Sequence, residues 1–360
     1  MTPNQHAPDR RITAGEHLQR IVAQALGTLP GPVLVRLSGR PPVVMDGQTL
    51  DPHVQLVLAL RKKRGARGLV EPSPAEGRAR FRHECLVFGS PKTKVGAVRD
   101  FDVPGPAGPL PVRHYAPEGE GPQPLTVYLH GGGFTIGDLE THDEPCRLLC
   151  RHARVHVLSV DYRLAPEHPF PAALEDAHAA LRWAQAHAAE LGADAGKVAI
   201  GGDSAGGNLA AVVSIEAARE DRPPAAQLLI YPVTDRRRSR PSEAMFSDGF
   251  FLSTADRKGF STCYTGGSAE ADEDPRVSPL LTPELGGLPP ALVVTAGFDI
   301  LRDEGLAYAE SLQAAGTETR HLHVPSLGHG FLHMTTVTPA AHQAMVRIAG
   351  DWRALLDGGG

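Results

Sequence analysis

The sequence predicts an α/β fold, in which a mostly parallel sheet carries helices on both faces and a cap lies beside one end of it. Two observations predict this class. Short apolar segments alternate with longer helical segments from about residue 98 to the C-terminus, and such alternation is typical of parallel sheets covered on both faces. One segment, 235–287, breaks the alternation and is too long for a simple connection. We expect that segment to form a lid, together with the N-terminal part of the chain.

Each element follows from its local pattern. Residues 99–103 and 112–115 form two expected strands around the turn-rich Pro104-Gly105-Pro106. Pro171 stands where proline best starts a helix. The remaining expected strands are 125–129, 155–160, 197–200, 227–231, 292–295 and 320–324. The expected helices are 144–152, 171–191, 205–219, 305–315 and 340–356.

The first part of the chain, to about Lys94, looks irregular apart from two amphipathic stretches. The first stretch, 18–26, predicts a helix. The second, 54–60, runs into the basic cluster 61–64. That cluster could bind an anionic partner, but it is short and Gly65 follows it. We therefore interpret it as a solvated helix end, where cations suit the helix dipole.

Composition excludes several classes of protein. The 360 residues carry a net charge of -5, which does not suggest a nucleic-acid partner. No apolar run is long enough to cross a bilayer, and no signal peptide is recognisable, so a cytoplasmic location is expected. Four cysteines are too sparse for a disulfide scaffold. Cys146 and Cys150 could bind a metal, but no further ligand stands at finger spacing, so we expect free thiols.

The sequence Gly202-Asp-Ser-Ala-Gly206 contains the pattern Gly-x-Ser-x-Gly. This pattern is typical of a sharp, strained turn between a strand and a helix that exposes a nucleophilic serine, here Ser204. The pattern alone is a weak signal, and an ordinary glycine-rich turn would satisfy it. Its context is stronger, because an apolar strand (198–200) precedes it and an apolar helix (209–213) follows.

A second glycine-rich segment, His130-Gly131-Gly132-Gly133, directly follows the apolar strand 125–129. Backbone N–H groups in such a loop can stabilise the oxyanion of a tetrahedral intermediate. We expect this loop to supply backbone donors, with Ala205, the residue after the serine, supplying the other. A phosphate-binding loop is the alternative, but the Gly-Lys-Ser/Thr ending is missing. A dinucleotide site does not fit either, because position 136 is isoleucine.

A serine hydroxyl becomes a good nucleophile only when a base takes its proton, and a carboxylate holds that base in place. When the serine lies in a turn of this kind, the acid and then the histidine follow it along the chain. His329 follows the end of a strand, which is where a catalytic base belongs. The other histidines after the serine are expected to be mostly structural; they are His321, His323, His333 and His342. Asp299 ends the strand before the helix at 305–315 and is the expected acid. Asp303 and Glu304 compete for that role, but they suit a helix N-terminus.

These residues resemble the hormone-sensitive-lipase-like esterases, the bacterial family IV carboxylesterases of the α/β-hydrolase superfamily. The resemblance runs from about residue 98 to the C-terminus. The matching blocks are 130–134, 137–143, 161–171, 202–207, 299–304 and 328–329. One departure is Ile300, where the family usually has proline. The N-terminal part is also longer than the family's usual start.

The resemblance implies an eight-stranded α/β-hydrolase fold with Ser204, Asp299 and His329 as the triad and Gly132, Gly133 and Ala205 as oxyanion donors. It implies a catalytic domain over 96–235 and 288–360, a cap insertion at 236–287, and an N-terminal extension, 1–95, that forms part of the cap. We assign the block 161–171 a structural role. The family often dimerises through the sheet edge near the last strand, so a homodimer is a further expectation.

The reaction expected is hydrolysis of short- to medium-chain acyl esters through an acyl-enzyme, with no cofactor and no metal. An apolar acyl pocket is expected from five residues, although they could equally form the core of the lid: Phe134, Phe246, Phe250, Phe251 and Leu252. An amidase, a lactonase or a deacetylase on the same scaffold stays open. A non-catalytic receptor would be expected to have a damaged triad, and here the triad is intact.

Overall fold

The computed structural model describes the chain except for residues 1–24, 26, 66, 89–91, 238–239 and 359–360. Its centre is an eight-stranded sheet with the order β10-β9-β8-β7-β5-β6-β4-β3. β3 pairs antiparallel with β4, and β4 pairs antiparallel with β6, whereas the other neighbours are parallel. The predicted mostly parallel sheet is confirmed. The strands are β3 (Ala97–Gly105), β4 (Gly108–Ala116), β5 (Gln123–Leu129), β6 (His156–Val160), β7 (Ala193–Asp203), β8 (Gln227–Ile230), β9 (Ala291–Phe298) and β10 (Thr319–Gly328).

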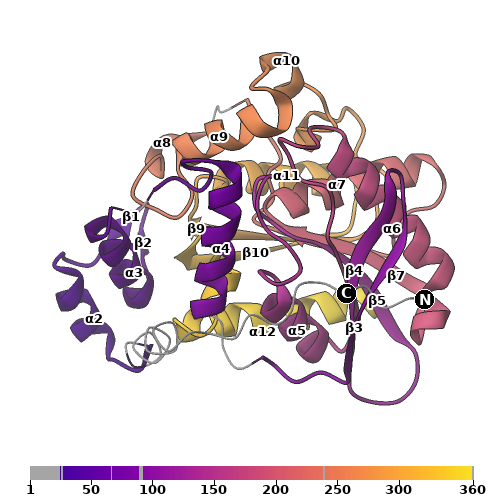
Figure 1. Cartoon of the computed structure of the whole chain (residues 1–360), viewed down its shortest axis with the longest axis horizontal. Coiled ribbons are helices and arrows are strands. Elements are labelled where there is room, and N and C mark those ends of the chain that lie inside the picture. The colour runs from indigo at the N-terminus through magenta and orange to yellow at the C-terminus, as the bar shows by residue number, and fades with distance from the viewer. Residues whose placement is uncertain (1–24, 26, 66, 89–91, 238–239, 359–360) are drawn as a thin grey trace.

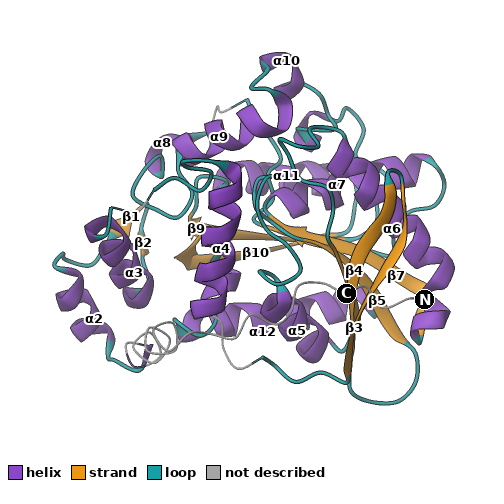
Figure 2. Cartoon of the chain, viewed as in Figure 1, coloured by secondary structure: helices purple, strands orange, loops and turns teal. Residues whose placement is uncertain are grey.

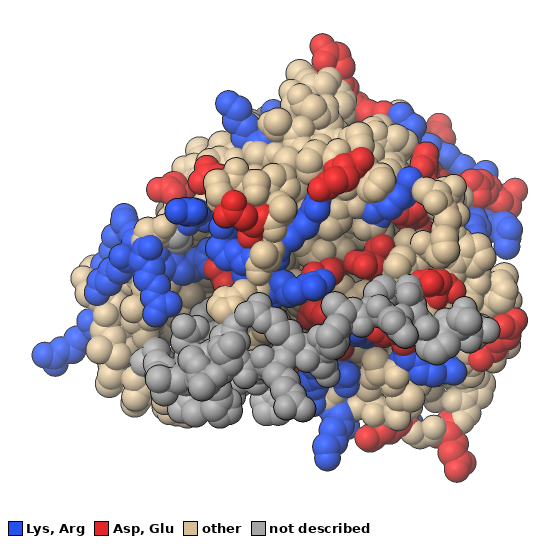
Figure 3. All heavy atoms as spheres, viewed as in Figure 1, with Lys and Arg blue, Asp and Glu red and all other residues tan. Residues whose placement is uncertain are grey.

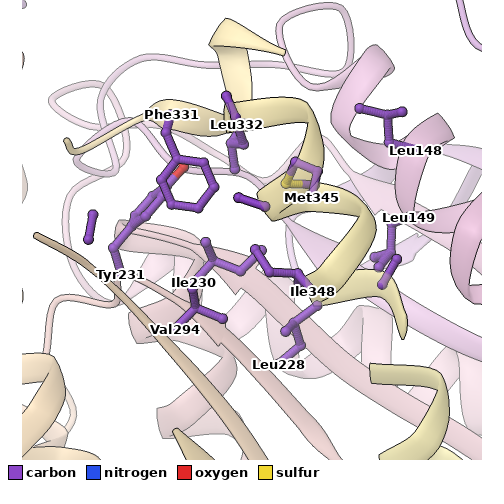
Figure 4. Packing of buried hydrophobic residues seen from close by; sticks show 14 of the residues in the cluster. Leu148, Leu149, Leu228, Ile230, Tyr231, Val294, Phe331, Leu332, Met345 and Ile348 are labelled. Atoms are coloured by element: carbon purple, nitrogen blue, oxygen red, sulfur yellow. The ribbon is translucent and has the colours of Figure 1, made fainter. Parts of the chain in front are cut away.

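Helices cover both faces of this sheet (Figure 2). One face packs against α5 (Asp143–Ala153) and α12 (Pro339–Leu356), and the other against α6 (Ala172–His187), α7 (Ala205–Arg219) and α11 (Arg302–Ala314). Successive strand residues point to opposite faces. Figure 4 shows Leu228 and Val294 packing toward Ile348 of α12, while their neighbours Leu229 and Val293 belong to the core on the other face. The five helices expected around this sheet are confirmed, with ends shifted by a few residues.

The N-terminal part is more regular than the sequence suggested. It contains α2 (Gly31–Ser38), the short antiparallel pair β1 (Val44–Met45) and β2 (Gln48–Thr49), α3 (Pro52–Lys63) and α4 (Pro74–Phe88). The expectation of an irregular segment was wrong for α2, for the β1–β2 pair and for α4. Helix α4 was missed because charged residues interrupt its apolar ones and no single apolar stripe marks it. The expected helix at 18–26 lies outside the described residues, except for Ala25.

The basic cluster occupies the last turn of α3 and its C-terminal end, as expected. Figure 3 shows basic side chains gathered over this part of the molecule. Arg61 differs from its neighbours, because its guanidinium lies 2.8 Å from the Glu84 carboxylate on α4. The interpretation as a solvated helix end is thus wrong for Arg61, which joins two helices.

The segment between β8 and β9 contains three short helices, α8 (Pro241–Met245), α9 (Thr254–Thr265) and α10 (Ala269–Asp272). In Figure 1 they lie above the sheet, and α4 crosses in front of it. The N-terminal part contacts this insertion directly, because the Leu69 N–H donates a 2.6 Å hydrogen bond to Asp256 of α9. Short 3₁₀ turns cover 188–191, 279–281 and 331–334. Among the helices that the structure describes, none has the length and apolar character needed to span a bilayer.

Candidate active site

Ser204 lies at the sharp turn between β7 and α7, with φ 53° and ψ -116°. A positive φ is rare for a residue with a side chain and is tolerated only where the surroundings enforce it. The glycines of the motif follow from crowding at this turn. A Cβ on Gly202 or Gly206 would overlap the carbonyl oxygen of Leu129 on the neighbouring strand β5. The motif therefore has its spacing because the turn passes directly over β5.

Ser204, His329 and Asp299 form one hydrogen-bonded chain. His329 Nε2 lies 2.9 Å from Ser204 Oγ, and His329 Nδ1 lies 2.8 Å from Asp299 Oδ2. Asp299 follows β9 and is 1% exposed, whereas His329 follows β10 at the edge of a cavity. The three strand ends meet because parallel strands place their carboxyl ends at one edge of the sheet. The geometry is that of a serine whose proton an imidazole can take.

The competing residues lie elsewhere. Glu304 accepts a 2.9 Å hydrogen bond from the Thr234 N–H and pairs with Arg257 of α9 at 3.1 Å. Asp303 accepts a hydrogen bond from the Ser242 N–H at 2.8 Å. Both carboxylates thus fasten the inserted segment to α11, and neither is among the hydrogen-bond partners of His329.

His321 and His323 project from the same face of β10, as expected. Both of their rings contact Thr295 Oγ1 on β9, at 2.8 and 2.9 Å. These contacts are structural.

The glycine-rich loop after β5 has left-handed backbone at three successive residues. The φ angles are 127° at Gly132, 58° at Gly133 and 60° at Phe134. A turn closes the loop, because the N–H groups of Thr135 and Ile136 both donate to the Gly132 carbonyl, at 3.0 and 2.9 Å. Gly132 and Gly133 line the same cavity as Ser204 and His329. Ala205 begins α7 directly after the serine.

Helix α9 of the insertion supports this loop. Phe260 packs so closely over Gly133 that a Cβ there would overlap its ring. The ring of Tyr264 stacks on Phe134, with centroids 3.8 Å apart and planes 7° from parallel. The sequence gives no signal for this contact, because about 130 residues separate the loop from α9. The insertion thus fixes the conformation of the glycine loop.

Arg78 of α4 supports the loop from the N-terminal side. Its guanidinium donates to the carbonyls of Thr135 at 2.7 Å and Ala165 at 2.8 Å, and it makes a bidentate ion pair with Glu167. The Ala165 N–H in turn donates to the Phe134 carbonyl at 2.8 Å. The block 161–171 therefore has the structural role that we expected. Sequence reasoning did not find Arg78.

The cavity beside Ser204 has a volume of about 180 Å³. Its walls combine the glycine loop, the N-terminal part and the insertion. Most of the lining side chains outside the catalytic region are apolar, and they include Val57, Leu69, Phe81, Phe251, Leu252, Phe260, Met334 and Val337. Charged and sulfur-containing side chains are also present, among them Arg61, Glu84, Cys85, Arg236 and Arg257. Both segments expected to form the cap thus contribute to this wall.

Three of the five residues expected in an acyl pocket line this cavity, namely Phe134, Phe251 and Leu252. Phe246 and Phe250 are not among its lining residues. Their rings pack against each other, with centroids 5.2 Å apart, and each lies 5.8 Å from the ring of Phe298. Phe246 is 0% exposed. The pocket assignment is therefore corrected for these two residues, which form part of the core beneath the insertion.

The cysteines follow expectation. All four are free, and Cys146 and Cys150 are buried on α5. Burial raises the pKa of the Cys150 thiol to about 12, so this thiol is protonated at neutral pH.

Comparison with known proteins places this geometry in a family. Residues 126–333 match the family model described as the alpha/beta hydrolase fold. Over 318 residues the chain is 49% identical to the carboxylic ester hydrolase LipN of Mycobacterium tuberculosis, covering 86% of this chain and 84% of LipN. It is 43% identical to the esterase LipI of the same organism, covering 72% and 83%.

Solved structures agree with these relatives. The ester-hydrolase EH1AB1 from the metagenome of Lake Arreo, solved in complex with a bipyridine phosphonate derivative, is 42% identical with a TM-score of 0.81, covering 85% of this chain and 98% of that one. The chain belongs to the α/β-hydrolase-fold family, in the branch of the hormone-sensitive-lipase-like carboxylesterases.

Proposed function

We propose that this carboxylesterase hydrolyses short- to medium-chain acyl esters, with Ser204 as nucleophile, His329 as base and Asp299 as the carboxylate that orients it. The observation that carries the proposal is the hydrogen-bonded chain from Ser204 through His329 to Asp299, which opens into a mostly apolar cavity. The names of the similar proteins, which are esterases and carboxylic ester hydrolases, support the reaction class.

The distances support a separate step for each group. His329 Nε2, at 2.9 Å, takes the proton of Ser204 Oγ as this oxygen attacks the ester carbonyl carbon. Asp299 accepts the Nδ1–H and stabilises the imidazolium. His329 then gives the proton to the departing alkoxide, which leaves as the alcohol. A water molecule, deprotonated by the same imidazole, then attacks the acyl-enzyme. The imidazolium returns this proton to Ser204 Oγ as the bond to the acyl carbon breaks and the acid leaves.

Backbone donors stabilise the oxyanion in both steps. We assign this role to the N–H groups of Gly132, Gly133 and Ala205, which flank the serine. One such donor is worth about 3 kcal/mol in the transition state. Phe260 and Arg78 hold the loop before substrate arrives, so little reorganisation is required during the reaction.

The cavity volume supports the limit on chain length. A dry cavity of about 150 Å³ holds a benzene molecule, so about 180 Å³ accommodates a group of roughly six or seven heavy atoms. We therefore expect kcat/KM for p-nitrophenyl esters to peak near butyrate or hexanoate and to fall for laurate and palmitate. A flat profile, or one that favours long chains only, would refute the short-acyl assignment.

The reaction and the nucleophile have a direct test. A fluorophosphonate probe should label the wild type and not Ser204→Ala, and the substitution should lower kcat by about 10⁶-fold, as comparable triad knock-outs do. If Ser204→Ala were still labelled, a residue other than Ser204 would be the nucleophile. Amides, lactones and acetylated amines in the same panel decide between an esterase and an amidase, a lactonase or a deacetylase.

Three wider expectations belong to this proposal. We propose a cytoplasmic enzyme that does not bind nucleic acid and forms a homodimer through the sheet edge. β10 supports the last point, because it is an edge strand of the eight-stranded sheet. Light scattering on purified protein would test the dimer, and a monomer at micromolar concentration would refute it.

A further inference from the structure

Three side chains that could bind a metal converge beside the cavity, and none of them belongs to the triad of Ser204, His329 and Asp299. They are His142 in the turn before α5, Asp203 at the end of β7 and His333 in the turn after His329. One ligand atom of each lies within 4.8 Å of the others. Asp203 and His333 also line the cavity, so a small solute could reach this site.

The hydrogen bonds around His142 leave a lone pair directed at this site. Thr141 Oγ1 donates its proton to the Asp138 carbonyl at 2.8 Å and accepts from the Asp138 N–H at 2.9 Å. With this proton on the Asp138 carbonyl, the contact of 2.9 Å between Thr141 Oγ1 and His142 Nδ1 is a hydrogen bond that the ring N–H donates. In the neutral imidazole Nε2 then carries the lone pair. The Gly131 N–H donates to this same atom at 3.3 Å.

That lone pair faces a carboxylate. His142 Nε2 lies 3.2 Å from Asp203 Oδ1, and with Nδ1 protonated the neutral ring offers no proton in that direction. The Gly131 N–H donates to both atoms and offsets part of their repulsion, and a cation between them would offset the rest. Two ligands at about 2.1 Å from a tetrahedral zinc ion stand roughly 3.4 Å apart. The observed separation already suits such an ion.

The surroundings also resemble those of a metal site. Asp203 accepts hydrogen bonds from the Gly131 N–H at 2.9 Å and the Tyr128 hydroxyl at 3.0 Å, which fix the carboxylate. Such outer contacts orient metal ligands. The ring of Phe81 packs edge-on against His333, with centroids 5.2 Å apart, and shields one side. Two imidazoles and one carboxylate suit zinc, and water can complete the coordination.

We propose that His142, Asp203 and His333 form a zinc site that inhibits the esterase. The inhibitory part rests on the proposed function. The bound dication faces the same cavity as His329, and like charges repel. It therefore opposes formation of the His329 imidazolium in the transition state. It also competes with the Gly131 N–H for Asp203, and Gly131 opens the loop that holds the oxyanion donors.

Calorimetric titration of metal-stripped full-length protein with ZnCl₂ tests the site without using activity. We expect one zinc ion per chain at pH 7.5. His333→Phe and His142→Gln should each weaken binding at least tenfold. The matched control is His321→Gln, which removes an imidazole from the pair at Thr295 and should leave the affinity unchanged. Absence of binding in the wild type, as expected if His142 carries a proton on Nε2, would overturn the proposal.

Two further measurements distinguish the three-residue site from a thiol site and from a folding defect. Cys85 Sγ lies 3.8 Å from His333 Nδ1, so a thiol could bind the metal instead. Cys85→Ser should retain zinc binding, and loss of binding there would refute the three-residue site. If His142→Gln does not fold, as circular dichroism would show, His333→Phe at the cavity wall decides alone.

Activity is then measured with and without zinc. The concentration that halves kcat should equal the calorimetric Kd and should rise with it in His333→Phe. Zinc binding with unchanged kcat would overturn the inhibitory part. Zinc binding by a protein without any esterase activity would keep the site and refute the proposed function instead.

Discussion

Arg78 provides the sharpest test of whether the N-terminal part contributes to catalysis. Arg78→Ala removes hydrogen bonds to the carbonyls of Thr135 and Ala165, at 2.7 and 2.8 Å. A hydrogen bond to a charged donor contributes about 1.5–3 kcal/mol. The ion pair with Glu167 adds at most about 1 kcal/mol, because the Glu167 side chain is 54% exposed. The Arg78 side chain thus stabilises the loop that carries the proposed oxyanion donors by a few kcal/mol.

Loosening that loop should reduce transition-state binding more than substrate binding. Complete loss of one oxyanion donor lowers kcat by about 10²–10³-fold. In Arg78→Ala the loop is still closed by its own turn and by Phe260, so the oxyanion donors should be displaced only in part. We therefore expect kcat to fall about 10- to 100-fold, with KM changed less than about threefold. Steady-state kinetics on p-nitrophenyl butyrate, and rescue of Arg78→Ala by added guanidinium, are the measurements.

The same helix supplies a matched control. Arg80 also donates to backbone carbonyls, those of Glu71 and Gly68, but both belong to the N-terminal part and not to the glycine loop. Arg80→Ala should therefore retain most of the activity at comparable thermal stability. Equal losses of kcat in the two variants would show that α4 acts only through stability. An unchanged kcat in Arg78→Ala would refute the link to the oxyanion loop.

Three further predictions concern the packing and the charges. Gly133→Ala should lower kcat about 100-fold or more, because its φ is 58° and the new Cβ would overlap Phe260; wild-type kinetics in this variant would contradict the assigned loop geometry. Phe251→Ala should shift the preferred acyl chain to greater length, whereas Phe246→Ala, in the core, should cost about 3–5 kcal/mol in unfolding free energy without that shift; identical chain-length profiles in both would show that Phe251 does not limit the pocket. Burial, a second histidine and an arginine lower the pKa of His114 to about 3. Below about pH 6.5 the unfolded state then binds more protons than the folded state, so the free energy of unfolding should decrease as the pH falls, by about 2 kcal/mol between pH 7 and 5. Urea titrations at the two pH values should show this loss reduced in His114→Gln, and an equal loss in the variant would assign it to other groups.

The pocket assignment shows where sequence reasoning reaches its limit. Five apolar residues were expected to surround the acyl group, and the structure brings three of them to the cavity. Phe250 and Phe251 are adjacent in sequence, yet one ring lies near Phe298 and the other lines the cavity. Hydrophobicity predicts burial, but it does not distinguish burial in a core from the wall of a pocket. Only the packing of the insertion decides which ring faces the substrate.

Local sequence patterns were enough to predict the fold class, the order of strands and helices from residue 97 onward outside the insertion 235–287, and the triad of Ser204, Asp299 and His329. These depend on local patterns and on the rule that parallel strands end at one edge of a sheet. The contacts that hold and surround these three residues come from the packing of distant segments. Arg78 reaches the carbonyl of Thr135, 57 residues away, and Phe260 covers Gly133 from the inserted helix α9. Such contacts join segments whose own patterns carry no information about one another, so they exist only once the whole chain has packed.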